Sequence, residues 1–208
     1  MASPASYSEL QSAIIAWLDD PTFTRAGEMI SLAEARLSRK LNTPEMEKTA
    51  TIPLVNGAFA LPADLMAIRA AYIDTAEGRY PLTELSEADY NLIFNPQRTG
   101  IPVNYYISGG TFTVGPLPDL AYSVKLSYKA FLPALSDTNP TNWLLTQAPD
   151  LYLSSAIARS ELFGWNDGRA AAFGAQEDAL LKEVNQQGAK KRYGDGPLVP
   201  GVLVRGYC

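Results

Sequence analysis

The residues of this sequence that could do acid–base chemistry are carboxylates, because the chain has no histidine and its one cysteine is Cys208. Nucleophilic triads that need histidine and zinc sites with histidine ligands are therefore excluded. One cysteine forms neither an intrachain disulfide nor a thiolate cluster. A pair of carboxylates in one cleft is the remaining route to hydrolysis.

No pair of acidic residues in the sequence has the arrangement of a known catalytic motif. Asp19 and Asp20 are adjacent and precede Pro21, which is typical of a turn that ends a helix. Pro118-Asp119 and Pro149-Asp150 match the first half of a metal-dependent nuclease motif, but no lysine has an acidic residue two positions before it. Phosphate-binding glycine loops are also missing. We expect no catalytic, cofactor-binding or metal-binding residue.

Two clusters could bind a partner instead of a substrate. Tyr105, Tyr106 and Phe112 could stack on bases, although cross-strand packing in a hairpin explains them better, since no basic residue lies among them. The basic run Lys190, Lys191 and Arg192 could contact phosphate or a protein, or could complement the dipole at the end of a helix.

Composition limits the class of protein. The chain has 208 residues, of which 47% are hydrophobic, and a net charge of −5. It is long enough to bury a core, and its acidic balance argues against tight, nonspecific binding of DNA. Residues 44–140 hold most of the acidic excess, with 6 basic and 10 acidic side chains. No apolar run is long enough to span a bilayer.

Helical periodicity occupies both ends of the sequence, and strand patterns occupy the middle. Apolar residues recur at helical spacing in residues 7–18, 24–41, 149–163 and 167–193. Residues 44–140 are rich in proline and alternate in hydrophobicity, with hairpin signals at Asn56-Gly57 and at Ser108, Gly109 and Gly110. The frequent prolines predict short, edge-like strands.

The sequence therefore predicts an α+β fold. Residues 1–43 and 141–195 would form one helical bundle from two helix pairs, and residues 44–140 a small antiparallel β insertion. Residues 196–208 would form an extended C-terminal tail that either folds back on its own domain or docks on a partner, because a free apolar end in water is an aggregation hazard. The lead-in Gly194-Asp195-Gly196-Pro197 favours docking on a partner. Its docking residues would be Leu198, Val199, Val202, Leu203, Val204 and Arg205.

The order of these elements resembles the head-to-tail adaptor proteins of short-tailed bacteriophages, also called head-completion or tail tubular A proteins. The resemblance covers about residues 7–195. The segments that carry it are Tyr7-Ser8-Glu9-Leu10, Ile30 to Leu41, Leu61-Pro62-Ala63-Asp64-Leu65, Leu82 to Ser86, Tyr105 to Phe112 and Pro149 to Leu153.

The resemblance implies a non-enzymatic ring, usually of twelve copies, between the portal protein and the tail nozzle (tubular B-like) protein. The bundle would build the ring wall, the β part with its Ser108-Gly109-Gly110 hairpin would face the tail, and the C-terminal segment would dock on the portal. DNA would pass through without specific binding, and the protein would assemble in the host cytoplasm into the virion. The sequence leaves open two alternatives, a carboxylate-dependent cell-wall hydrolase and a monomeric binding module.

Overall fold

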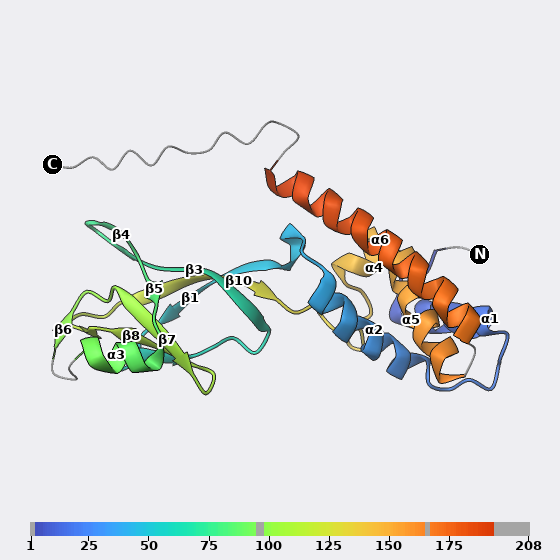
Figure 1. The fold of residues 1–208 in the computed structure, drawn as a ribbon, viewed down its shortest axis with the longest axis horizontal. Coiled ribbons are helices and arrows are strands. Elements are labelled where there is room, and N and C mark those ends of the chain that lie inside the picture. The colour runs from blue at the N-terminus through green and yellow to red at the C-terminus, as the bar shows by residue number, and fades with distance from the viewer. Residues whose placement is uncertain (1–2, 95–97, 165–166, 194–208) are drawn as a thin grey trace. The chain divides into compact units, whose positions relative to one another are not determined.

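The computed structural model describes residues 3–94, 98–164 and 167–193. The chain divides into two compact units, which Figure 1 shows as a group of helices and a group of strands. The helical unit comprises Met1–Glu45 and Leu132–Cys208, and the β unit comprises Met46–Phe131. The chain passes from one unit to the other twice, so the β unit is inserted into the helical unit.

The helical unit contains five described helices. They are α1 (Tyr7–Leu18), α2 (Ala26–Lys40), α4 (Trp143–Gln147), α5 (Pro149–Phe163) and α6 (Asp167–Tyr193). A reciprocal cap begins α1, in which Ser6 Oγ accepts the Glu9 N–H at 3.3 Å and Glu9 accepts the Ala5 N–H at 2.7 Å. A short 3₁₀ turn, Pro44–Met46, leads out of this unit.

Helix α5 is the centre of the helical unit, because the other four helices all pack against it. Its side chains are buried around most of its circumference, including Leu151, Tyr152, Ala156 and Ile157. Leu10 and Ile14 of α1 and a stripe on α2 (Ile30, Ala33, Leu37) complete the core. Burial on all sides explains why α5 lacks a polar face of its own.

The β unit begins with a four-stranded antiparallel sheet. Its strands are β1 (Glu47–Pro53), β3 (Leu65–Thr75), β4 (Gly78–Pro81) and β10 (Ser123–Ala130), in the order β1-β10-β3-β4. On β10, Val124, Leu126, Tyr128 and Ala130 are buried while the residues between them are partly exposed. This alternation places one face of the sheet on a core.

A second sheet has the order β2-β8-β7-β5, formed by β2 (Ala58–Ala60), β5 (Thr83–Glu84), β7 (Asn104–Ser108) and β8 (Thr111–Gly115). Helix α3 (Glu87–Ile93) connects β5 to β7, which run parallel. A third, short parallel pair joins β6 (Thr99–Gly100) to β9 (Leu117–Pro118). One hydrophobic cluster holds side chains from both larger sheets, including Phe59, Phe112, Ile73 and Leu126.

The predicted helical bundle with a small antiparallel β insertion is wrong. The structure is α+β, but the sheets form a multi-strand core of their own, and two of the strand pairings are parallel. Prolines suggested short strands, yet β3 runs for 11 residues because Pro53 and Pro81 stand at strand ends and β3 has none. Parallel pairing was missed because it requires a crossover connection, here α3, that hairpin patterns do not reveal.

Candidate functional site

The acidic residues considered as catalytic candidates serve local structure. Asp19 ends α1 in the left-handed conformation (φ 54°), and Asp20 accepts hydrogen bonds from the N–H and the hydroxyl of Thr22 at 2.9 and 2.6 Å. The predicted helix-ending turn is confirmed. Asp150 accepts the Leu151 N–H at 2.9 Å in the first turn of α5, and Asp119 in the β unit accepts the Tyr122 hydroxyl at 2.9 Å.

The aromatic cluster is part of the hydrophobic core, as the cross-strand interpretation predicted. Tyr105 stacks on Phe112 with ring centroids 4.3 Å apart, and Phe112 stacks on Phe59 at 4.7 Å. Burial, with Glu84 nearby, raises the pKa of Tyr105 to about 12. Tyr106, on the opposite face, packs on Tyr90 of α3. These rings therefore present no exposed stacking platform.

The hairpin proposed to face the tail is an exposed two-residue turn. Gly109 and Gly110 have φ angles of 55° and 78° between Ser108 of β7 and Thr111 of β8, which are paired. Positive φ at both central positions is the requirement of a type I′ turn. Ser108, Gly109 and Gly110 are all exposed. Its contact with a tail protein stays a prediction.

The basic run lies in the last turn of α6, where its charge complements the helix dipole. Lys191 contacts Glu45 at 2.5 Å and Gln147 at 3.1 Å, so its ammonium group holds the end of α6 to other parts of the helical unit. Lys190 is exposed. A role of Lys190, Lys191 and Arg192 toward phosphate or the portal stays a prediction.

The predicted docking tail lies outside the described residues. This holds for the segment 196–208 and for its named residues, which are Leu198, Val199, Val202, Leu203, Val204 and Arg205.

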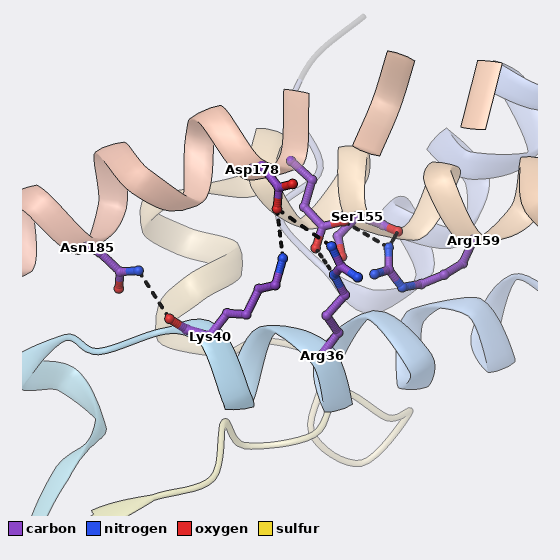
Figure 2. Close-up of polar contacts among 7 residues, drawn as sticks. Arg36, Lys40, Ser155, Arg159, Asp178 and Asn185 are labelled. Carbon is purple, nitrogen blue, oxygen red and sulfur yellow. Dashed lines mark hydrogen bonds and ion pairs between the residues drawn. The ribbon is translucent and has the colours of Figure 1, made fainter. Parts of the chain in front are cut away.

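Sequence reasoning missed a polar cluster that joins α2, α5 and α6 (Figure 2). Glu177 of α6 has a side chain only 1% exposed, and it receives Arg36 of α2 at 2.9 Å and Arg159 of α5 at 3.1 Å. Arg159 also donates to the Ser155 carbonyl oxygen at 2.6 Å. A buried carboxylate needs positively charged partners such as these two arginines, because without them its negative charge would be buried and uncompensated.

The same cluster continues toward the end of α2. Asp178 accepts Lys40 at 2.8 Å, and this hydrogen bond holds the pKa of Asp178 below its usual value. Asn185 accepts the Asn42 N–H at 2.7 Å and donates to the Lys40 carbonyl at 3.1 Å. It thereby binds the Lys40 carbonyl, one of the last carbonyl groups of α2, which have no partner within the helix. Except for Arg159, the partners of these α6 side chains lie over a hundred residues away in the sequence, so the spacing of residues on α6 gave no signal.

A second buried cluster anchors the chain where it returns from the β unit. Glu34 of α2 accepts the Leu135 N–H at 2.8 Å and the Tyr152 hydroxyl at 2.5 Å. Ser38 Oγ accepts the Leu132 N–H at 3.2 Å, and Asn142 donates to the Pro133 carbonyl at 2.8 Å. The sequence contains a sign of this cluster, because Glu34 is a charged residue within the apolar stripe of residues 30–41 on its helix.

These two clusters have side chains whose charges and hydrogen bonds are used inside the fold. Among residues 3–94, 98–164 and 167–193, no group of three or more acidic or cysteine side chains could hold a metal ion. Within the same residues, no helix has the length and hydropathy to cross a membrane. The arrangement is that of a scaffold that holds helices together.

Comparison with known proteins identifies the family. A family model described as SU10 adaptor protein matches residues 5–201, which is nearly the whole chain. The chain belongs to the SU10 adaptor protein family. No curated protein matches the sequence.

Membership of the SU10 adaptor protein family makes this chain a phage adaptor protein. It supports a structural role, and it implies that the protein is a virion component that contacts other head and tail proteins. The predicted resemblance to phage adaptors is confirmed at this level. The matched segment includes both units and reaches into the predicted docking tail.

Proposed function

We propose that copies of this chain form a ring, with about twelve subunits, that joins the portal of a short-tailed phage to the tail nozzle. The observation that carries the proposal is the family match over residues 5–201. The helical unit would build the ring wall, and the β unit, with its Ser108-Gly109-Gly110 turn, would contact the tail. The genome would pass through the ring during ejection.

The proposed role is non-enzymatic. It is supported by the way the buried carboxylates are used, since Glu177 is held by two arginines and Glu34 by a tyrosine and a backbone N–H. A general acid or base needs access to a reacting group. The net charge of −5 also suits a conduit, because few neutralised phosphates mean weak retention of DNA.

The proposed portal-docking segment is the apolar end of the chain. Burying one large aliphatic side chain contributes about 1.5–3 kcal/mol, and ordering the backbone costs about 1–2 kcal/mol per residue. One tail is therefore expected to bind weakly, and the simultaneous binding of many tails around a ring raises the overall affinity. Pro200 and Gly201 oppose a continuous helix, so strand addition to an exposed edge is the docking mode we favour. Its residues are those predicted from the sequence: Leu198, Val199, Val202, Leu203, Val204 and Arg205.

The experiment is truncation after Gly196, followed by incubation with portal-bearing heads. The shortened protein should keep its far-ultraviolet spectrum and melting temperature but no longer join the heads. A full-length variant with serine at positions 198, 199 and 202–204 is the matched control for length, and it should also fail. If either variant joins heads as the wild type does, tail docking is contradicted. If the wild type itself does not join portal-bearing heads, the proposed function is wrong.

A further inference from the structure

Two surfaces of the helical unit are shaped to fit a helix. A groove of about 420 Å³ lies on α5 and α6, with Ala158 and Leu162 along one side and Ala170 and Gly174 along the other. We call it the α5–α6 groove. Leu162 is 64% exposed, and an added Cβ at Gly174 would meet nothing within 4 Å, so a helix could approach closely.

The second surface is the exposed side of α1. Ser8, Ser12 and Ala16 are exposed at four-residue intervals, and this row, which we call the α1 ridge, lines a shallow hollow of about 490 Å³. The buried residues of α1, Leu10 and Ile14, face the core of their own unit. The α1 ridge is therefore directed away from the α5 of its own copy.

Ridge and groove have matching spacing. Ala158 and Leu162 are four residues apart, as are Ala170 and Gly174, and the α1 ridge repeats at the same interval. Rows of residues four apart interdigitate in the commonest class of helix packing. Small side chains on both surfaces allow the backbones to come close together.

The charges of the two surfaces are opposite. Arg36 and Arg159 line the α5–α6 groove, and together with the neighbouring Lys40 they face two carboxylates, Glu177 and Asp178, which leaves one positive charge in excess. The charged residue of α1 is Glu9, beside the ridge, and α1 has no basic residue. Asp19 and Asp20 follow directly. Opposite charge on two surfaces favours their mutual contact and fixes its register.

We propose that the α1 ridge of one copy packs into the α5–α6 groove of the next copy. The occupant of the groove is a second copy of this chain, and the inference rests on the proposed ring. Because the two surfaces differ, each copy uses one of them toward each neighbour. Contacts of this heterologous kind form a ring when the fixed rotation between copies closes on itself.

The test on the groove side uses two glycines of α6. In Gly174→Leu the new side chain fills the groove, while in Gly168→Leu it does not, and an added Cβ at either position meets nothing within 4 Å. Both changes replace a glycine of α6 by a better helix former, at position 174 in the helix interior and at position 168 in its first turn. We expect Gly174→Leu to reduce the copies retained per portal-bearing head about tenfold or more, since overfilling a packed contact is destabilising. Gly168→Leu should retain the wild-type number.

The test on the ridge side uses two serines with the same local contact. The Ser12 hydroxyl donates to the Ser8 carbonyl at 2.9 Å, and the Ser31 hydroxyl donates to the Gly27 carbonyl at 3.1 Å, both on exposed helix surfaces. Ser12→Tyr should lose copies as Gly174→Leu does, and Ser31→Tyr should not. Circular dichroism establishes that each variant is folded before counting.

The outcomes separate this inference from the adaptor function. If wild type joins the heads and folded Gly174→Leu and Ser12→Tyr are retained at wild-type number, the ridge-and-groove contact is wrong while the adaptor function stands. Equal losses in the two control variants would also overturn it, because the effect would not depend on these surfaces. If wild type does not join the heads, the proposed function fails first.

Discussion

Tyr152 donates its hydroxyl hydrogen to Glu34 Oε1 at 2.5 Å, across 118 positions of sequence and inside the core of the helical unit. The same oxygen accepts the Leu135 N–H at 2.8 Å. Helix α2, helix α5 and the segment that returns from the β unit therefore meet at one buried carboxylate oxygen. Asn142 adds a fourth element, since it donates to the Tyr152 hydroxyl at 3.1 Å.

Removal of the Tyr152 hydroxyl tests this junction. Tyr152→Phe leaves the ring in place but leaves one Asn142 donor and one Glu34 lone pair without their partner. We expect the free energy of unfolding to fall by about 1–3 kcal/mol, the cost of an unsatisfied buried polar group. Urea denaturation followed by far-ultraviolet circular dichroism measures it. Tyr7→Phe, on a partly exposed tyrosine of α1, is the control and should change stability by under about 0.5 kcal/mol.

Glu34 should also give the fold a pH dependence. Burial raises the pKa of Glu34 above its usual value, and its two hydrogen bonds offset only part of that effect. A raised carboxyl pKa means that the folded state binds the proton more tightly than the unfolded state. This contribution to stability is full below the unfolded pKa and is lost as pH rises through the folded pKa.

The measurement is urea unfolding of wild type and Glu34→Gln at pH values from about 4 to 7. Glutamine keeps a carbonyl oxygen for Tyr152 and Leu135 and carries no charge, so its stability should fall less with rising pH. The free energy of unfolding of the glutamine variant minus that of wild type should therefore increase with pH. A constant difference over this range would contradict the assignment.

The helices and the second hairpin could be predicted from the sequence, because their signals are local. Ser6 and Glu9 marked the start of α1, Pro149 the start of α5, and Gly109-Gly110 the turn between β7 and β8. Each depends on residues only a few positions apart. The parallel pairing of β5 with β7 depends on α3 crossing between them, and no local pattern encodes that.

The polar clusters could be predicted less well than the elements that contain them. In the sequence Glu177 is one acid among several on a largely polar helix, yet it is almost fully buried between Arg36 and Arg159. Its burial follows from how α2, α5 and α6 pack, which the spacing of residues on α6 does not contain. The buried contacts of Glu34 were easier to predict from the sequence, because a charged residue within an apolar stripe of a helix requires a buried partner.

Asn185 is expected to stabilise the end of α2. Asn185→Ala removes the acceptor of the Asn42 N–H and the donor to the Lys40 carbonyl. Each of these two hydrogen bonds contributes about 0.5–1.5 kcal/mol, and the melting temperature should fall accordingly. Gln186→Ala, at the neighbouring exposed position of the same helix, controls for helix propensity and should not lower it. Equal melting temperatures for the two variants would contradict the capping role.

The turn between β7 and β8 should tolerate only residues that adopt positive φ. Gly110 has φ 78° with open space around it, so Gly110→Val is opposed by backbone strain and not by a clash. We expect a loss of about 1–2 kcal/mol for valine and a smaller one for Gly110→Asn, because asparagine adopts this conformation more readily. Chemical denaturation compares the two. A valine variant as stable as wild type would show that the turn rearranges.

The basic run at the end of α6 contains two neighbouring lysines for which we expect different roles, one in the stability of the fold and one in contact with the portal. Both lysines are exposed, but Lys191 is paired with Glu45 and Gln147, whereas Lys190 forms no ion pair with any residue that the structure describes. Lys191→Met should lower stability by up to about 1 kcal/mol, the usual range for a partly exposed ion pair.

Lys190→Glu should leave stability nearly unchanged but weaken joining to portal-bearing heads, more strongly at low salt because exposed charges are less screened there. Gln186→Glu introduces a carboxylate one turn earlier and controls for that added negative charge, although it lowers the net charge by one where Lys190→Glu lowers it by two. If Lys190→Glu and Gln186→Glu join heads as well as wild type at low salt, Lys190 does not contact the portal, and its charge serves only the dipole of α6.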